Sequence, residues 1–155
     1  MSSPLYCIDA SALIELKDTY RQTTFKTLWE NIGKLIADGV LISHKEVFKE
    51  ITAGNDELVP WAKKHKEIFL PIDQQQEEAL KKVLTKFPNF ADELRSKPFA
   101  DPWVVALAMA RNATVVMMEK HANRGGRPRI PDVCDAFTVP HIELPEWFEA
   151  LKWEF

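Results

Sequence analysis

Acidic side chains that follow apolar runs are the residues of this 155-residue sequence best suited to chemistry. Asp9 directly follows the apolar run at residues 5–8, and Glu119 closes the run at residues 114–118. In open parallel sheets, ligands bind at the carboxyl ends of the strands. If both runs are strands of such a sheet, Asp9 and Glu119 are expected at one edge. Ser11 is placed to hydrogen-bond the Asp9 carboxylate or to cap the following helix.

Two further acids are candidates, although each has an ordinary structural explanation. Glu46 and Glu50 lie four residues apart and therefore on one face of a helix, where surface carboxylates are common. Asp101 precedes Pro102, which is the pattern of a helix cap followed by a first-turn proline.

The four acids indicate a functional site only if they are considered together. If Asp9, Glu50, Asp101 and Glu119 converge, mutual repulsion raises their pKa values unless a cation offsets it. A site made only of carboxylate oxygens suits Mg²⁺ or Mn²⁺, and one ion or two would both be compatible with it.

A basic, glycine-containing segment follows Glu119 and is a candidate for binding RNA phosphates. Arginine and lysine bind phosphate through charge-assisted hydrogen bonds, which weaken as salt rises. The alternative is a solvated loop. The basic residues are Lys120, Arg124, Arg127 and Arg129.

The elements that would position these side chains alternate between strands and helices. Short apolar runs at residues 5–8, 40–42, 69–70 and 114–118 are typical of strands buried on both faces. Helical spacing of apolar residues occurs between them, and Pro145 precedes a terminal helix expected at 146–155. The expected helices cover 25–36, with Thr23 or Thr24 as cap, 47–54, a short turn around Trp61, 74–86 and 103–111. This order predicts an α/β fold, a three-layer α/β/α domain with a mostly parallel central sheet.

Length and composition predict a single domain spanning residues 1–155. A hydrophobic fraction of 46% and a formal net charge of −3 exclude a disordered chain and a general polycation. The absence of a signal-peptide pattern or a long apolar stretch predicts a cytoplasmic protein without a membrane span. Cys7 and Cys134 are isolated in the sequence and are expected to be buried free thiols.

Histidine and tryptophan offer weaker signals. None of the four histidines lies at ligand spacing from another, which argues against a histidine metal site, and His121 is of interest only because it follows Glu119. The five tryptophans are expected mostly in the core, with Trp147 or Trp153 as candidates for an exposed dimer or partner contact.

The segments that carry the acids resemble the motifs of PIN-domain ribonucleases, in the family's order and across nearly the whole chain. The matching residues are Asp9 and Ser11 in CIDASALIE, Glu50 (Glu46 as second choice) in LISHKEVFKEITAG, Asp101 in ADPWVVALA and Glu119 in TVVMMEK. The segment IPDVCDAF and the closing helix resemble a PIN-like subgroup catalogued mainly as a domain of unknown function, which is similar to toxins of the VapC kind. One departure concerns the last motif, where Met117 replaces the usual Thr and Glu119 the usual Asp.

This resemblance implies a metal-dependent endoribonuclease, with RNA as substrate and Mg²⁺ or Mn²⁺ held by the four acids. It also implies the toxin of a toxin–antitoxin pair, with a small antitoxin protein as partner and a homodimer as assembly. Two other functions remain open. The departure at Met117 and Glu119 is compatible with a catalytically weak or inactive PIN-fold module that binds RNA or protein. A phosphate-transferring hydrolase with Asp9 as nucleophile is less favoured, because Asp9-Ala10-Ser11 lacks the second Asp of haloacid-dehalogenase-like sites.

Overall fold

A five-stranded, all-parallel sheet forms the centre of the computed structural model, which describes residues 4–90 and 99–155. The strand order is β3-β2-β1-β4-β5. Register is set by pairs such as Tyr6 with Leu41 and Ile8 with Val116. The strands are β1 (Tyr6–Ile8), β2 (Leu41–His44), β3 (Phe69–Leu70), β4 (Thr114–Val116) and β5 (His141–Ile142).

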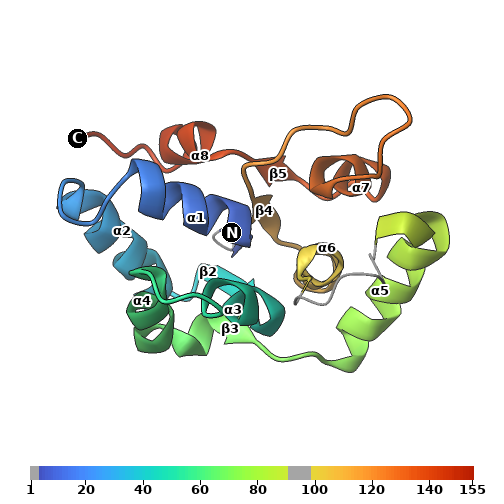
Figure 1. Ribbon diagram of the computed structural model, residues 1–155, viewed down its shortest axis with the longest axis horizontal. Helices are drawn as coiled ribbons and strands as arrows, with labels where there is room; N and C mark the ends of the chain where they lie inside the picture. Colours follow the sequence, from blue (N-terminus) through green and yellow to red (C-terminus); the bar gives the residue numbers. More distant parts are fainter. Residues whose placement is uncertain (1–3, 91–98) are drawn as a thin grey trace.

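Helices cover both faces of this sheet, which makes the fold a three-layer α/β/α arrangement, as the sequence predicts. Figure 1 shows α5, α6 and α7 on one side of the strands and α1, α2 and α8 on the other. None of the helices in the described parts of the chain combines the length and apolar composition needed to cross a membrane. The helices are α1 (Ala10–Thr19), α2 (Lys26–Ala37), α3 (Lys45–Ile51), α4 (Leu58–Lys64), α5 (Gln74–Lys86), α6 (Asp101–Arg111), α7 (Ile130–Ala136) and α8 (Leu144–Ala150). Two short 3₁₀ turns, η1 (Lys66–Ile68) and η2 (Pro88–Phe90), precede β3 and follow α5.

Several helix ends differ from those the sequence suggested. Phe25, rather than Thr23 or Thr24, precedes α2, and it makes no side-chain capping bond. The last helix spans Leu144–Ala150 instead of 146–155, since Lys152 takes a left-handed conformation (φ 58°) that ends it. Both differences lie at termini, where a few local contacts decide the boundary.

The core is continuous from the sheet into both helical layers and includes both cysteines as buried free thiols, as expected. Trp147 of α8 is completely buried and packs edge-on against Tyr6 of β1, with ring centroids 5.6 Å apart. The expectation that Trp147 is an exposed contact for another protein is therefore wrong. Its ring is needed between α8 and the sheet.

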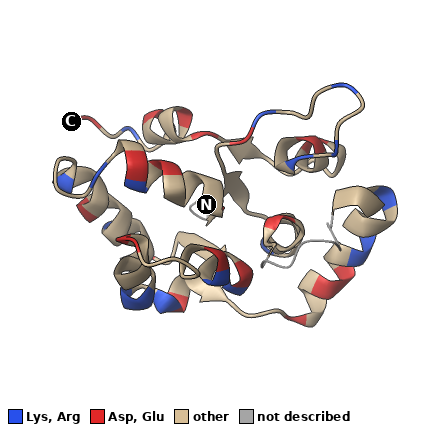
Figure 2. Ribbon diagram, viewed as in Figure 1, with Lys and Arg blue, Asp and Glu red and all other residues tan. Residues whose placement is uncertain are grey.

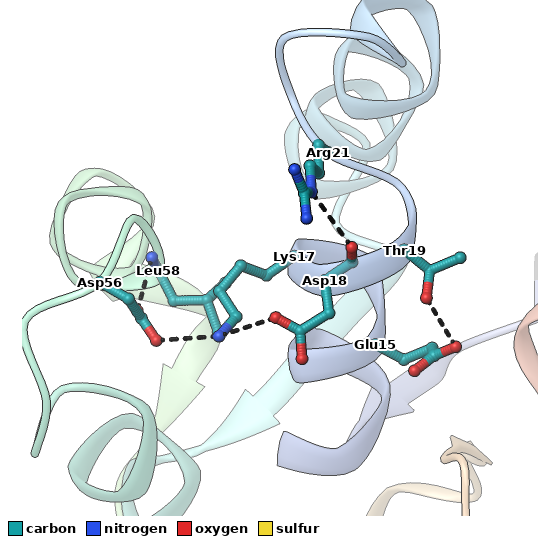
Figure 3. A network of polar contacts seen from close by, with 7 residues as sticks. All are labelled: Glu15, Lys17, Asp18, Thr19, Arg21, Asp56 and Leu58. Atoms are coloured by element: carbon teal, nitrogen blue, oxygen red, sulfur yellow. Dashed lines mark hydrogen bonds and ion pairs between the residues drawn. The ribbon is translucent and has the colours of Figure 1, made fainter.

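The end of α1 is joined to the segment before α4 by a surface network of charges (Figure 3). Lys17 Nζ lies 3.0 Å from Asp18 and 3.1 Å from Asp56, whose other oxygen accepts a hydrogen bond from the Leu58 backbone N–H. Exposed pairs of this kind contribute at most about 1 kcal/mol each. The network thus adds modestly to the packing that places α1, the helix that begins directly after Asp9.

A buried polar pair links β2 to α5. His44 stacks on Trp103, its Nδ1 accepts from the Glu46 N–H, and its Nε2 lies 2.8 Å from Gln76 Oε1. Because Nδ1 is an acceptor, the proton resides on Nε2 and is donated to Gln76. Burial lowers the pKa of His44, in keeping with this neutral ring.

We expect the Gln76→Ala substitution to reduce the free energy of unfolding by about 1–3 kcal/mol, because it leaves the buried His44 N–H and the Pro71 carbonyl without their partner. Urea denaturation followed by circular dichroism measures this loss. The exposed Gln74, in the first turn of the same helix, provides the control, and Gln74→Ala should change stability by less than about 0.5 kcal/mol. Equal losses in the two variants would contradict the importance of the buried pair.

Candidate functional site

The order of the strands places a binding edge between β1 and β4. From β1 the chain proceeds outward to β2 and β3 on one side, and β4 and β5 occupy the other side. At such a reversal, the loops after the two central strands diverge and leave a crevice at the carboxyl edge of the sheet. Asp9 directly follows β1, and its N–H donates to the Val116 carbonyl at the end of β4.

Asp9 is almost completely buried, with 1% of its surface exposed. One carboxylate oxygen, Oδ2, caps α1 by accepting from the Ser11 N–H at 3.2 Å and from the Ser11 hydroxyl at 2.7 Å. Ser11 Oγ in turn accepts from the Met118 N–H at 3.0 Å. The other oxygen, Oδ1, is buried without a hydrogen-bond partner among the residues that the structure describes. Asp9 is therefore both the helix cap and a buried carboxylate with one oxygen left for another ligand.

Asp101 enters the site as the first residue of α6, not as its cap. The residue before the helix is Ala100, whose N–H donates to Glu50 Oε1 at 2.9 Å. The expectation that Asp101 caps α6 is thus wrong, because helical hydrogen bonding already begins at Ala100, whose carbonyl accepts from the Val104 N–H at 2.9 Å.

Glu119 lies three residues beyond β4, further from the strand than the apolar run suggested. Its Oε2 accepts from the N–H of Ile130, the first residue of α7, at 3.2 Å. Met117, at the position where the resemblance to PIN domains led us to expect a hydroxyl residue, is buried, and its sulfur is 3.3 Å from the Glu119 N–H. The backbone of Glu119 therefore has a weak acceptor at this position where a hydroxyl was expected.

Three of the four predicted acids meet. Carboxylate oxygens of Asp9, Asp101 and Glu119 all lie within 4.8 Å of one another. They line a pocket of about 620 Å³, and Glu50 and Ser11 belong to its wall. Among the described residues, Glu50 is not part of the group of three, so it is an outer member of the site. Glu46, the second choice, pairs with Lys49 at 3.0 Å and does not line the pocket.

The basic loop borders this pocket, and Figure 2 shows its charged residues spaced between β4 and α7. Lys120, Arg127 and Arg129 line the pocket, whereas Arg124 does not. The guanidinium of Arg127 lies over the Phe99 ring, 5.4 Å from its centroid. The loop thus presents positive charge directly beside the three acids.

Asp132 of α7 is a residue that the sequence analysis missed. Its Oδ2 accepts from the backbone N–H groups of Ala122 and Arg129, at 2.9 and 2.8 Å, and so closes the basic loop at its base. The sequence did contain a signal for this role. Pro131 marks the first turn of a helix, and Asp132 stands at the third helical position, where an acid often accepts from the backbone at the helix start.

Burial raises the pKa values of two of the acids, and repulsion adds to the rise at one of them. Desolvation raises the pKa of Asp9, although the hydrogen bonds from Ser11 oppose the rise. Desolvation also raises the pKa of Glu119, and the nearby Asp9 charge adds to it, whereas the Ile130 N–H and Arg129 and Arg127 act in the opposite direction. Two neighbouring carboxylates are therefore held in surroundings that disfavour their charged forms.

A family model described as a domain of unknown function, DUF4411, matches residues 6–155 of the sequence. The chain belongs to this family. No curated protein matches the sequence. The part of the chain matched by DUF4411 extends from β1 to the C-terminus and contains all four acids and the basic loop.

The donor set of this DUF4411 site fits a hard divalent cation. Three carboxylates at short range, one with a buried oxygen that has no partner among the described residues, provide oxygen ligands only. Mg²⁺ and Mn²⁺ prefer such ligands. A cation there would offset the repulsion between Asp9 and Glu119 and the cost of burying Asp9.

Proposed function

We propose that this protein is a metal-dependent endoribonuclease with a PIN-like active site. The observation that carries the proposal is the convergence of Asp9, Asp101 and Glu119 within 4.8 Å in a pocket bordered by arginines. These three residues would hold Mg²⁺ or Mn²⁺. When bound, the ion supplies Lewis-acid activation of water and charge neutralisation at the phosphodiester.

The surrounding residues have separate tasks in this proposal. Ser11 holds Asp9 in one orientation through two hydrogen bonds, and the Ile130 N–H holds Glu119. Glu50 fixes the start of α6 through Ala100 and thereby the position of Asp101. Lys120, Arg127 and Arg129 attract the RNA phosphates on either side of the bond to be cut.

The wider role is proposed from the resemblance to VapC-like toxins: an RNA-cleaving toxin in the cytoplasm, restrained by a small antitoxin and assembled as a homodimer. An RNA-binding module of the same fold without activity is the second candidate, favoured by the buried Met117 in place of a hydroxyl residue. The two candidates differ in whether RNA is cut.

Cleavage of a panel of structured RNAs by the full chain tests the proposal. We expect cutting in Mg²⁺ or Mn²⁺ and none in EDTA, since the carboxylates alone would have no cation to position water. Cleavage at the same rate in EDTA would exclude the mechanism. RNA binding without cleavage in either metal would favour the inactive module.

The two glutamates of α3 provide a matched pair. We expect Glu50→Gln to lower the cleavage rate by roughly 10–100-fold, the range seen when residues that orient metal ligands are changed. Glu46→Gln, one turn earlier on the same helix and outside the pocket, should stay within about 3-fold of the unmodified protein, because surface substitutions away from a site have small effects. Initial rates at fixed RNA concentration measure the difference. A larger loss for Glu46→Gln would reverse their assignment.

A further inference from the structure

Two histidines and an aspartate form a second cluster outside the acidic pocket. His121 lies in the segment after β4, Asp135 belongs to α7, and His141 begins β5. The Nε2 atoms of the two histidines approach different oxygens of Asp135, at 2.7 Å for His121 and 2.8 Å for His141. Potential ligand atoms of all three residues lie within 4.8 Å of one another. Three separate elements thus direct metal-ligating side chains at a common point.

The chemistry of this set differs from that of the acidic pocket. Two imidazole nitrogens and one carboxylate suit Zn²⁺ and related transition metals, whereas the oxygen-only pocket suits Mg²⁺ or Mn²⁺. Zinc binds such atoms at roughly 2.0–2.2 Å, so the ligand atoms must lie roughly 3.3–3.5 Å apart around a tetrahedral ion. Side-chain rotation can bring about this approach at His121 and Asp135, whose side chains are 58% and 57% exposed, while the His141 side chain, 22% exposed, keeps its position.

The space beside the two rings leaves room for further ligands. His121 and His141 line a hollow of about 450 Å³, together with Glu143 and Glu146. A water molecule or one of these glutamates would supply the fourth position of a tetrahedral site. The two histidines are thus open on the side of the hollow, which Asp135 does not line.

The location suggests what an ion would do there. His121 is two residues after Glu119, and the Ala122 N–H already donates to Asp132 of α7. An ion that joins His121 to Asp135 and His141 would fasten the segment that carries Glu119 to α7 and β5. We propose that His121, Asp135 and His141 form a structural binding site for a zinc-class transition-metal ion.

The alternative is a hydrogen-bonded triad without metal, in which each ring donates an Nε2 proton to Asp135. Both arrangements explain the short contacts between the rings and the carboxylate. They differ in whether removal of one histidine changes the affinity for zinc.

Isothermal titration of the tag-free full chain with Zn²⁺ decides between them, with Mg²⁺ present in excess to occupy the acidic pocket. We expect one equivalent of zinc to bind, and His121→Ala and His141→Ala each to weaken it at least ~10-fold, since even residues behind the ligands alter metal affinity by roughly 10–100-fold. His65→Ala removes a histidine that packs on Trp61, far from this cluster in the sequence, and should leave zinc affinity unchanged. Substitution with Co²⁺ should give visible absorption bands that both cluster variants lose.

Zinc binding of equal strength in the unmodified protein and in both cluster variants would overturn the proposal, as would the absence of binding to the unmodified protein. His121→Ala alters an exposed side chain, and circular dichroism verifies that the variant is folded. The titration contains no RNA and is repeated in the Asp9→Asn variant, so its outcome is independent of whether the protein is a nuclease.

Discussion

The Asp9→Asn substitution is expected to lower the proposed metal-dependent RNA cleavage by roughly 10³-fold, which corresponds to ~4 kcal/mol of transition-state stabilisation. Asp9 is the most buried of the three converging acids, and its Oδ1 has no hydrogen-bond partner among the described residues. An amide at this position keeps the shape of the side chain but removes the negative charge that a cation requires. Cleavage rates in Mg²⁺ and Mn²⁺ measure the loss.

The same substitution should stabilise the metal-free protein. Without a cation, the buried Asp9 carboxylate has lost its hydration; its Oδ2 accepts from Ser11, and its Oδ1 has no hydrogen-bond partner among the described residues. The neutral amide of Asn avoids much of this cost and removes the repulsion with the neighbouring Asp101 and Glu119 carboxylates, which lie within 4.8 Å. We expect the free energy of unfolding in EDTA to rise by about 1–3 kcal/mol, the usual range for one unsatisfied buried polar group. Opposite effects on activity and stability distinguish a functional acid from a structural one.

The pH dependence of stability provides a second readout of Asp9. Because burial raises the pKa of Asp9 and of Glu119, the folded state holds more protons than the unfolded state above the ordinary carboxylate pKa of about 4. Stability of the metal-free protein therefore falls as pH rises from that value through the raised pKa values. In Asp9→Asn this fall should be smaller, and Mg²⁺ should oppose it in the unmodified protein.

Urea denaturation at several pH values, with and without EDTA, measures these effects. Glu30→Gln is the matched control, because it removes one negative charge from an exposed position on α2 and should leave the pH dependence unchanged. If Asp9→Asn destabilised the metal-free protein, its carboxylate would be a structural cap whose loss weakens α1. That result would contradict the assignment of Asp9 as a metal-binding carboxylate.

The convergence of the acids was predictable because each follows from a general property of parallel sheets. A residue just after a buried strand must lie at the carboxyl edge, which accounts for Asp9, and the first turn of a helix entering from that edge accounts for Asp101. The parallel sheet itself was predictable from short apolar runs separated by helices. The distance of Glu119 from its strand was not predictable, because β4 ends at Val116 while the apolar run continues through two methionines.

The histidine cluster illustrates what the sequence could not reveal. Its three residues depend on α7, which has only two turns, and on β5, which has two residues and therefore no measurable periodicity. His121 and His141 are twenty positions apart and approach each other only because β5 pairs with β4. The different surroundings of Glu46 and Glu50 were equally undetermined, because four-residue spacing puts both on one face. In the folded chain Glu50 accepts from the Ala100 N–H and lines the pocket, whereas Glu46 pairs with Lys49.

Neutralising two arginines of the basic loop is expected to weaken RNA binding by roughly 10–100-fold at low salt. Arg127 and Arg129 line the pocket beside the acids, and their positive charges lower the pKa of Glu119. If each neutralises one phosphate, the double variant Arg127→Gln with Arg129→Gln loses two contacts. The slope of log affinity against log salt should then decrease by about 1.4, since each contact to single-stranded RNA contributes about 0.7.

Binding is measured in the Asp9→Asn background with EDTA, so that neither cleavage nor metal affinity contributes. The matched control is Lys81→Gln with Lys82→Gln on the exposed face of α5, which changes the net charge equally but lies outside the pocket. Arg124→Gln distinguishes an effect of the loop's charge from an effect of the pocket, because Arg124 belongs to the same loop but does not line the pocket. Equal losses in the α5 control would mean that RNA responds to net charge alone. A loss confined to Arg127 and Arg129 would mean that the RNA backbone passes the three carboxylates, as the proposed cleavage at that point requires.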